Sequence, residues 1–192
     1  MTNIFPHRIC NNTGAIIASD IEQSCEKICR WPLEEFKDAI GQCVGYLFGD
    51  KEEKNFYAFI FYHAVIEIEK DFPGINLGDI YILNMAVHSK YQRFGIGSQV
   101  IKKWLKAKIG KQLNHQPEIT IKRLVVDVRE SNQVAQSFFK KNDFQAIKVL
   151  RGFFKDSGED AYRMVFPPQV ESRSLPGLGA KRNIPRVPSQ IY

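Results

Sequence analysis

The chain has 192 residues, of which 44% are hydrophobic and 25% are charged, and its formal net charge is +6. This length and composition are typical of a globular protein with one principal domain. The sequence has no apolar run of about 18 residues, which argues against a transmembrane helix, and its N-terminus lacks the pattern of a secretory signal. We therefore expect a cytoplasmic protein. The positive charge favours a polyanionic ligand or an acidic partner surface, and no nucleic-acid-binding motif accompanies it.

The N-terminal part of the chain predicts a short β segment followed by two helices. Residues 1–18 fit either a hairpin or one strand after a loose arm. Residues 19–22, Ser-Asp-Ile-Glu, have the spacing of a capping box and predict that the first helix begins there. Pro32 predicts the end of that helix and the start of a second. Cys25 and Cys29 lie one helical turn apart without a nearby histidine, which favours reduced thiols over a metal site.

The rest of the chain alternates between apolar, β-branched runs and polar connections. The charged residues 51–54 predict a hairpin tip, and residues 112–120 predict a polar connection. From Pro167 onward the sequence has no hydrophobic periodicity, so we expect a domain over 1–166 and a basic, Pro- and Gly-rich tail over 167–192. We expect strands over 43–50, 56–67, 80–87, 121–129, 144–150 and 160–166, a helix after the glycine turn at 95–97, and another from 130–132 to 142–143.

A glycine-rich turn at residues 92–97, Gln-Arg-Phe-Gly-Ile-Gly, joins an apolar strand to an amphipathic helix. Gly95 and Gly97 have no Cβ, so the backbone can approach a ligand closely. A helix that begins here offers unpaired N–H groups and the positive end of its dipole. Together with Arg93, this arrangement predicts a phosphate-binding site.

Asp127 stands in the β-branched run of residues 124–129 and points away from the apolar face of that strand. A carboxylate near the centre of a sheet is costly unless it is paired or functional. Two interpretations follow: an ion pair with Arg129 or Arg123, or a functional role.

Two blocks, residues 81–105 and 124–164, resemble the motifs of the Gcn5-related N-acetyltransferases (GNATs). The second block contains Val-Asp-Val-Arg-Glu-Ser-Asn and Gly-Glu-Asp-Ala-Tyr-Arg-Met, and is similar to N-terminal protein acetyltransferases, including the bacterial ribosomal-alanine enzymes. The resemblance covers about residues 19–166. It implies an α/β (α+β) GNAT fold with a mixed, mostly antiparallel central sheet flanked by helices. It also implies a V-shaped opening between the cofactor strand and the next strand.

The resemblance implies acetyl-CoA as the cofactor. Its pyrophosphate would bind the glycine turn, its pantetheine arm would lie along strand 85–87, and Asn132 would hydrogen-bond that arm. Each feature also has a plain structural interpretation, such as Asn132 capping its helix. The cofactor-binding residues implied are Met85, Ala86, Val87, Arg93, Phe94, Gly95, Ile96, Gly97, Ser98, Asn132 and Phe139.

The same resemblance implies a catalytic pair. Asp127 would be a base that acts through water, and Tyr81 would orient the amine or act as an acid. The acceptor groove would include Trp31, Glu34 and the pair Phe153-Phe154. Trp31 also fits ordinary helix packing, and Tyr81 also fits ordinary strand packing.

The sequence departs from the family at two places. Phe139 replaces a tyrosine whose hydroxyl lies near the CoA sulfur, and Phe153-Phe154 replaces a Tyr-Tyr pair that grips the substrate backbone. Both changes remove hydroxyl groups that relatives use.

The resemblance implies acetyl transfer to a protein N-terminal α-amine, with a ribosomal protein as one candidate acceptor. The alternatives are a lysine or small-amine acetyltransferase and a non-catalytic acyl-CoA-binding subunit. We expect a monomer or homodimer with no metal ion.

Overall fold

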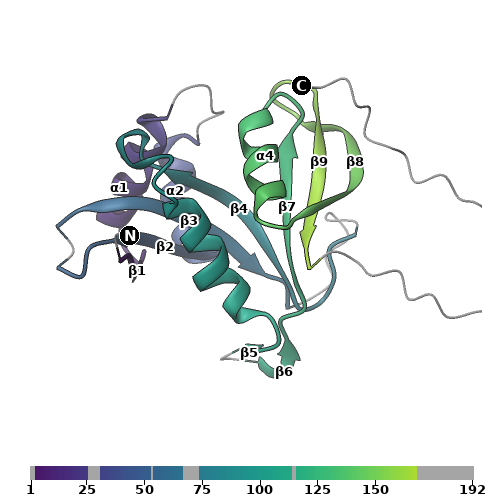
Figure 1. Cartoon of the computed structure of the whole chain (residues 1–192), viewed down its shortest axis with the longest axis horizontal. Coiled ribbons are helices and arrows are strands. Elements are labelled where there is room, and N and C mark those ends of the chain that lie inside the picture. The colour runs from purple at the N-terminus through teal and green to yellow at the C-terminus, as the bar shows by residue number, and fades with distance from the viewer. Residues whose placement is uncertain (1–2, 26–30, 53, 67–73, 114–115, 168–192) are drawn as a thin grey trace, which may run out of the picture.

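The computed structural model describes residues 3–25, 31–52, 54–66, 74–113 and 116–167. Its centre is a seven-stranded sheet with the order β1-β2-β3-β4-β7-β9-β8 (Figure 1). Strands β4 and β7 are parallel, and the other neighbouring pairs are antiparallel. The predicted mixed, mostly antiparallel sheet is confirmed. Its strands are β1 (Phe5–Arg8), β2 (Val44–Gly49), β3 (Phe56–Ala64), β4 (Asp79–Val87), β7 (Arg123–Arg129), β8 (Gln145–Phe154) and β9 (Glu159–Phe166).

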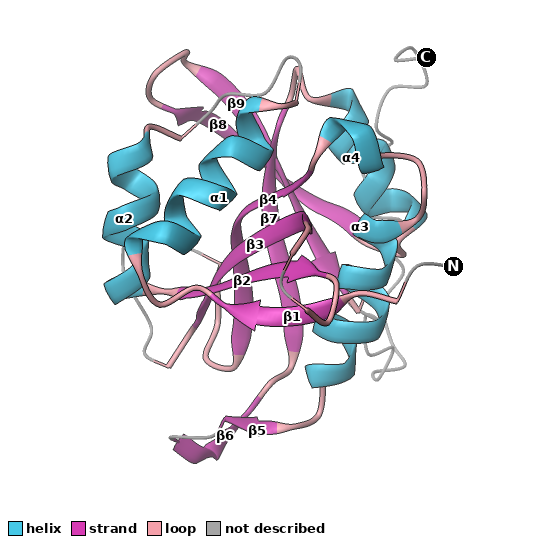
Figure 2. Ribbon diagram, turned by 90° about the vertical axis from the view of Figure 1, so that its left-hand side faces the viewer, coloured by secondary structure: helices cyan, strands magenta, loops and turns pink. Residues whose placement is uncertain are grey.

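Helices cover both faces of this sheet (Figure 2). In β3, Phe59 and Phe61 pack with α1 and α2, whereas Ala58 and Ile60 pack with the helical segment after the glycine turn and with α4. This alternation follows from the period of two along a strand, so β3 serves two cores at once. The helices are α1 (Asn12–Gln23), α2 (Leu33–Gln42), α3 (Ile96–Gln99) and α4 (Gln133–Lys141). Helix α3 continues as a π-helical stretch (Val100–Leu105) and a 3₁₀ turn (Lys106–Lys108), and a further 3₁₀ turn lies at Ser89–Tyr91.

The first helix begins earlier than the sequence predicted. Asn11 caps α1, because its side-chain oxygen accepts a hydrogen bond from the Gly14 N–H at 3.0 Å. Ser19, the predicted cap, is buried inside the helix and accepts a hydrogen bond from Gln23. The capping-box prediction was therefore wrong, since Asn11 provides a cap two turns upstream. Cys29, which the sequence places one helical turn after Cys25, lies outside the described residues.

Two further boundaries differ from the prediction. The connection at 112–120 contains a small hairpin of β5 (Gln112–Leu113) and β6 (Gln116–Thr120). Strand β8 extends to Phe154, beyond the predicted strand end at residue 150, so Phe153 and Phe154 both lie in the strand. The start of α2 directly after Pro32 is confirmed.

Two further sequence predictions concern the tail and the membrane. The predicted tail lies outside the described residues except for Pro167. In the part of the chain that the structure describes, no helix has the length and apolar character needed to cross a bilayer.

The sheet opens between β4 and β7. Their parallel pairing begins at Asp79 and Arg123 and ends at Ile82 and Val126, although both strands continue. Leu83 interrupts the register between β3 and β4, which is a β-bulge at the point where the strands separate. The predicted V-shaped opening is thus present, and it can be followed in Figure 1 where β4 and β7 diverge.

Candidate active site

The glycine turn has the backbone geometry of an anion site. Gly95 has φ 81° and is the N-cap of α3, and Arg93 also has a positive φ, 68°. Left-handed residues of this kind turn successive N–H groups toward one side of the chain. The first N–H groups of α3 have no acceptor within the helix. Arg93 and Phe94 are exposed beside them, so the turn fits a phosphate.

The sequence suggests that Gly97 allows a ligand to approach, and the structure gives it a role in packing. A Cβ on Gly97 would lie 3.0 Å from the ring of Phe138 in α4 and 3.4 Å from the Val87 side chain. The missing Cβ therefore lets α4 pack against the start of α3. This contact connects the phosphate turn to the helix that begins at Asn132.

Gln92 ties the turn back to β4. Its amide Nε2 donates to the Val87 carbonyl at 3.0 Å and to the Cys25 sulfur at 3.3 Å. Cys25 is buried and also donates to the Val87 carbonyl, at 3.2 Å. The end of α1 thus helps to hold the turn. In β4, Met85 and Ala86 pair with β3 on one side, while their other side faces the opening where pairing with β7 has ended.

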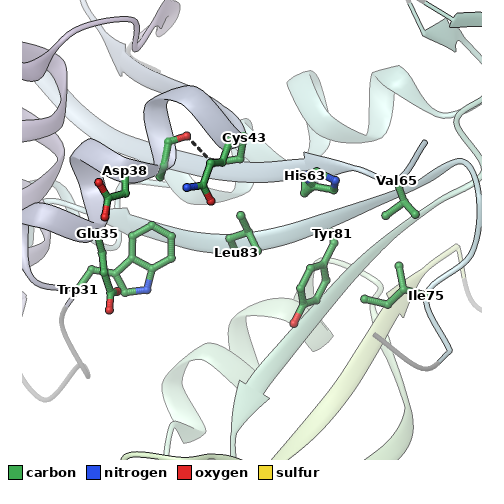
Figure 3. A pocket seen from close by; sticks show the side chains of 11 residues that line it. Trp31, Glu35, Asp38, Cys43, His63, Val65, Ile75, Tyr81 and Leu83 are labelled. Carbon is green, nitrogen blue, oxygen red and sulfur yellow. Dashed lines mark hydrogen bonds between the residues drawn. The ribbon is translucent and has the colours of Figure 1, made fainter. Parts of the chain in front are cut away.

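A pocket lies on the α1 and α2 side of the opening, with a volume of about 490 Å³, a size typical of ligand sites. Trp31, Glu35 and Asp38 stand at one end, and Tyr81 stands toward the other (Figure 3). Its lining residues are Trp31, Glu35, Asp38, Ala39, Gln42, Cys43, His63, Val65, Ile75, Tyr81 and Leu83.

Tyr81 and Asp127, the predicted catalytic pair, are brought together. The Tyr81 hydroxyl donates to Asp127 Oδ2 at 2.8 Å. Asp127 also accepts from Arg163, with Nε 2.8 Å from Oδ1 and Nη2 2.6 Å from Oδ2. The side chains of Arg163 and Asp127 are 1% and 2% exposed. Tyr81 lines the pocket, whereas Asp127 lies behind it.

The ion-pair interpretation of Asp127 had the wrong partners. Arg129 binds Asp156 and stacks on Phe154, and Arg123 binds Asp79. Arg163 was missed because it lies far along the chain. One signal was available in the sequence, a lone arginine within the otherwise apolar run 161–166. The structure makes it the register partner of Asp127.

Burial changes the acidity of two groups in the pocket. Desolvation, followed by the charge of Asp127, raises the pKa of Tyr81 far above its usual value, so this tyrosine stays a neutral phenol. Desolvation also raises the pKa of the Cys43 thiol to about 11, although the charge of Arg8 acts in the opposite direction.

The predicted groove residues divide between pocket and surface. Trp31 lines the pocket, and its backbone N–H donates to the buried carboxylate of Glu22, which also accepts from Asn84 of β4. Glu34 does not line it, because its exposed side chain pairs with Lys37. Its neighbour Glu35 lines the pocket.

The remaining predicted residues lie outside the pocket lining. Phe153 and Phe154 contact each other near the end of β8. Phe139 is buried in the core against Phe138 and Phe144. Asn132 caps α4 by accepting from the Ala135 N–H at 3.0 Å, as the plain interpretation predicted.

Comparisons with known proteins agree with this geometry. An N-alpha-acetyltransferase of Sulfurisphaera tokodaii is 36% identical over 87 residues, which are 45% of this chain and 47% of the relative. The chain thus matches about half the length of this curated relative.

Solved structures share the fold. The ribosomal-protein-S18-alanine N-acetyltransferase of Escherichia coli superposes with a TM-score of 0.61 at 19% identity, covering 90% of this chain and 99% of that one. Arabidopsis thaliana NAA60 in complex with a bisubstrate analogue gives 0.62 at 20% identity, covering 85% and 97%. The same plant protein has been solved with acetyl-CoA, with a TM-score of 0.60 at 20% identity over 85% and 98% of the two chains.

The sequence profile of the acetyltransferase (GNAT) domain matches residues 34–146, which is more than half of the chain. These residues run from the start of α2 to the beginning of β8 and include both the glycine turn and the opening between β4 and β7. The chain belongs to the GNAT acetyltransferase family.

Proposed function

We propose that this chain transfers an acetyl group from acetyl-CoA to the α-amine at a protein N-terminus. The observation that carries the proposal is the opening between β4 and β7. It places an unpaired edge of β4 between a phosphate-type turn and a pocket that contains Tyr81.

The residues of the turn and of β4 fit acetyl-CoA. The positive φ of Gly95 and the free N–H groups at the start of α3 suit its pyrophosphate, with Arg93 beside them. Met85 and Ala86 offer backbone groups to the pantetheine arm in the manner of a neighbouring strand. When bound, acetyl-CoA supplies the acetyl group as a reactive thioester. Asn132 and Phe139 remain proposed cofactor contacts on α4.

The pocket side fits the acceptor. Tyr81 lines the pocket and is hydrogen-bonded to Asp127 of the neighbouring strand β7, so we assign it the contact with the acceptor amine. Asp127 does not line the pocket, and we assign it an indirect role through Tyr81. The names of the curated relatives and of the plant and bacterial neighbours support an N-terminal acceptor. A ribosomal protein is one such acceptor.

The direct test is incubation with acetyl-CoA and a panel of peptides with free N-termini, followed by mass spectrometry. We expect a mass increase of one acetyl group at the α-amine. Acetylation of lysine side chains or polyamines alone would replace the N-terminal assignment by the small-amine or lysine alternative. Binding of CoA in titration calorimetry without any product would support a non-catalytic binding subunit.

A further inference from the structure

The last turn of α1 holds the segment of β4 that follows the end of its pairing with β7. That pairing ends at Ile82. Beyond it, Glu22 of α1 accepts a hydrogen bond from the Asn84 side chain at 2.8 Å. Further along the strand, Cys25 donates to the Val87 carbonyl at 3.2 Å. The end of α1 therefore supports β4 along the part of the strand that borders the opening.

Glu22 connects this segment of β4 to the acceptor pocket. It is 1% exposed, and a carboxylate buried to this extent is costly unless its oxygens accept hydrogen bonds. Its Oε1 accepts from Asn84 Nδ2, and its Oε2 accepts from the backbone N–H of Trp31 at 2.8 Å. Trp31 stands at one end of the pocket that we assign to the acceptor (Figure 3). One side chain therefore holds both the end of the pocket and the strand.

Asn84 lies where a shift of β4 would reach the cofactor side. It follows Leu83, where the register between β3 and β4 is interrupted, and it precedes Met85, which we propose contacts the pantetheine arm. The strand ladder is locally disrupted at a β-bulge, so side-chain contacts there do more to fix the backbone. A displacement of Asn84 would therefore move Met85 as well.

We propose that Glu22 is a positioning residue that sets the separation between Trp31 and the bulged segment of β4, and so holds the acceptor at the thioester. The inference rests on the acetyltransferase function proposed above. Glu22 is not among the described residues that line the pocket, so it acts through its two partners. Misplacing a substrate-holding group by about 1 Å can lower a rate by about a hundredfold.

The glycine turn is held by other contacts of the same helix end. Ser24 accepts from the Ser89 N–H at 3.0 Å, and Gln92 donates to the Cys25 sulfur at 3.3 Å. These hydrogen bonds do not involve Glu22. Loss of the Glu22 contacts should therefore weaken the binding of the acceptor more than the binding of acetyl-CoA.

The first test is Glu22→Gln, which keeps the size of the side chain. A glutamine has one oxygen and one NH₂ group, so it can accept from only one of the two donors that meet Glu22. We expect the KM for an N-terminal peptide to rise about three- to tenfold, while the KM for acetyl-CoA changes less than about twofold. Steady-state kinetics with each substrate varied in turn measures both values. An unchanged peptide KM, or equal changes in the two KM values, would overturn the inference.

An exchange of the two side-chain types gives a sharper test. In Asn84→Asp alone two carboxyl groups face each other, so we expect a larger rise in peptide KM than in Glu22→Gln. In Glu22→Gln/Asn84→Asp, the introduced amide can donate to the introduced carboxyl group and accept from the Trp31 N–H. The double variant should therefore recover most of the wild-type peptide KM. Losses that simply add would show that this contact does not position the acceptor.

A second measurement follows Trp31 without catalysis. The chain has two tryptophans, so Trp104→Phe leaves Trp31 as the single source of tryptophan fluorescence. In this background we expect Glu22→Gln to increase the quenching of Trp31 by acrylamide, because the hydrogen bond that fixes its backbone is lost. Adding Asn84→Asp should return the quenching to the parent value. Unchanged quenching in Glu22→Gln would show that Glu22 does not hold Trp31.

The matched control is Ile21→Val, at the neighbouring position of α1. It removes one methyl group from the buried face of the helix and leaves the Glu22 hydrogen bonds in place. We expect the melting temperature to fall by about 2–4 °C, with both KM values and the Trp31 quenching unchanged. A raised peptide KM in Ile21→Val would attribute the effect to general destabilisation and overturn the inference.

The outcomes separate this inference from the proposed function. No transfer to any amine by the wild-type protein would remove the proposed function, and the quenching of Trp31 would still decide whether Glu22 holds it. Transfer by the wild-type protein together with an unchanged peptide KM in Glu22→Gln would remove only the inference.

Discussion

Among single residues, Tyr81 is an aromatic side chain of a strand that is also a candidate catalytic residue. Its side chain is only 7% exposed, yet it lines the pocket and donates to Asp127. The sequence predicted both members of this pair but not Arg163, which gives them their electrostatic setting. The pairing depends on strand order, and a period of two along one strand does not reveal the neighbour.

The Cys43 thiol predicts a pH dependence of stability. Below pH 9 it is protonated in both the folded and the unfolded chain. Between pH 9 and its folded pKa of about 11, the unfolded chain loses the proton and the folded chain keeps it. The free energy of unfolding of wild type should therefore fall in this window relative to Cys43→Ala, as measured by urea unfolding. A difference that does not change with pH would contradict this.

Among the elements of the fold, the helix α2 lines the pocket with two acidic side chains. Glu35 and Asp38 lie three residues apart on one face, and within the described residues neither has an ion-pair partner. The whole chain has a net charge of +6, whereas these two carboxylates make this side of the pocket negative. It favours acceptor peptides with a basic residue near the N-terminus.

We expect Glu35→Gln/Asp38→Asn to lower kcat/KM about three- to tenfold for a peptide with lysine at its second position, because exposed pairs are weak. The same peptide with glutamine there should be unaffected. Glu34→Gln is the matched control, since Glu34 pairs with Lys37 outside the pocket. The loss should shrink at high salt. Equal losses for both peptides would refute a charge effect.

The glycine turn and α4 form a second unit, joined through Gly97. A Cβ there would press on Phe138 at 3.0 Å and displace either the turn or α4. We expect Gly97→Ala to raise the KM for acetyl-CoA severalfold in steady-state assays. The control Gly41→Ala adds a methyl where nothing lies within 4 Å in a helix, so it should stabilise the chain by about 0.5–1 kcal/mol and leave that KM unchanged. An unchanged KM in Gly97→Ala would show that the turn tolerates the shift.

In the whole molecule, the short parallel pairing of β4 with β7 is the strand pairing that joins the two halves of the sheet within the described residues. Asp79 and Arg123 stand at its start as a buried bidentate pair, with contacts of 2.8 and 2.7 Å. This pair lies at the end of the opening where β4 and β7 are still paired, so it links the two halves of the sheet.

Removing one member should destabilise the fold. We expect Asp79→Ala to lower the free energy of unfolding by about 3–5 kcal/mol, because it leaves a buried guanidinium uncompensated. The double variant Asp79→Leu/Arg123→Met should recover most of that loss in urea unfolding. Little loss in the single variant would mean that water reaches Arg123 after the change.

Local sequence patterns were enough to predict the strands, the glycine turn and the family. These signals are local: alternation, a left-handed glycine and a helix start all lie within a few residues of one another. They failed at the start of α1, where two local caps competed and the burial of Ser19 was invisible. Glu35 lines the pocket and its neighbour Glu34 does not, because one residue along a helix turns a side chain by about 100°.

The arrangement of the candidate site follows from tertiary contacts. The opening at Ile82 and Val126, the ion pair of Asp127 with Arg163, and the pocket between α2 and β4 all join segments far apart in the sequence. Such contacts follow from strand order and from which face each helix covers. Burial and charge pairing depend on which residues are neighbours in space. The composition of one strand therefore cannot specify the strand that pairs with it.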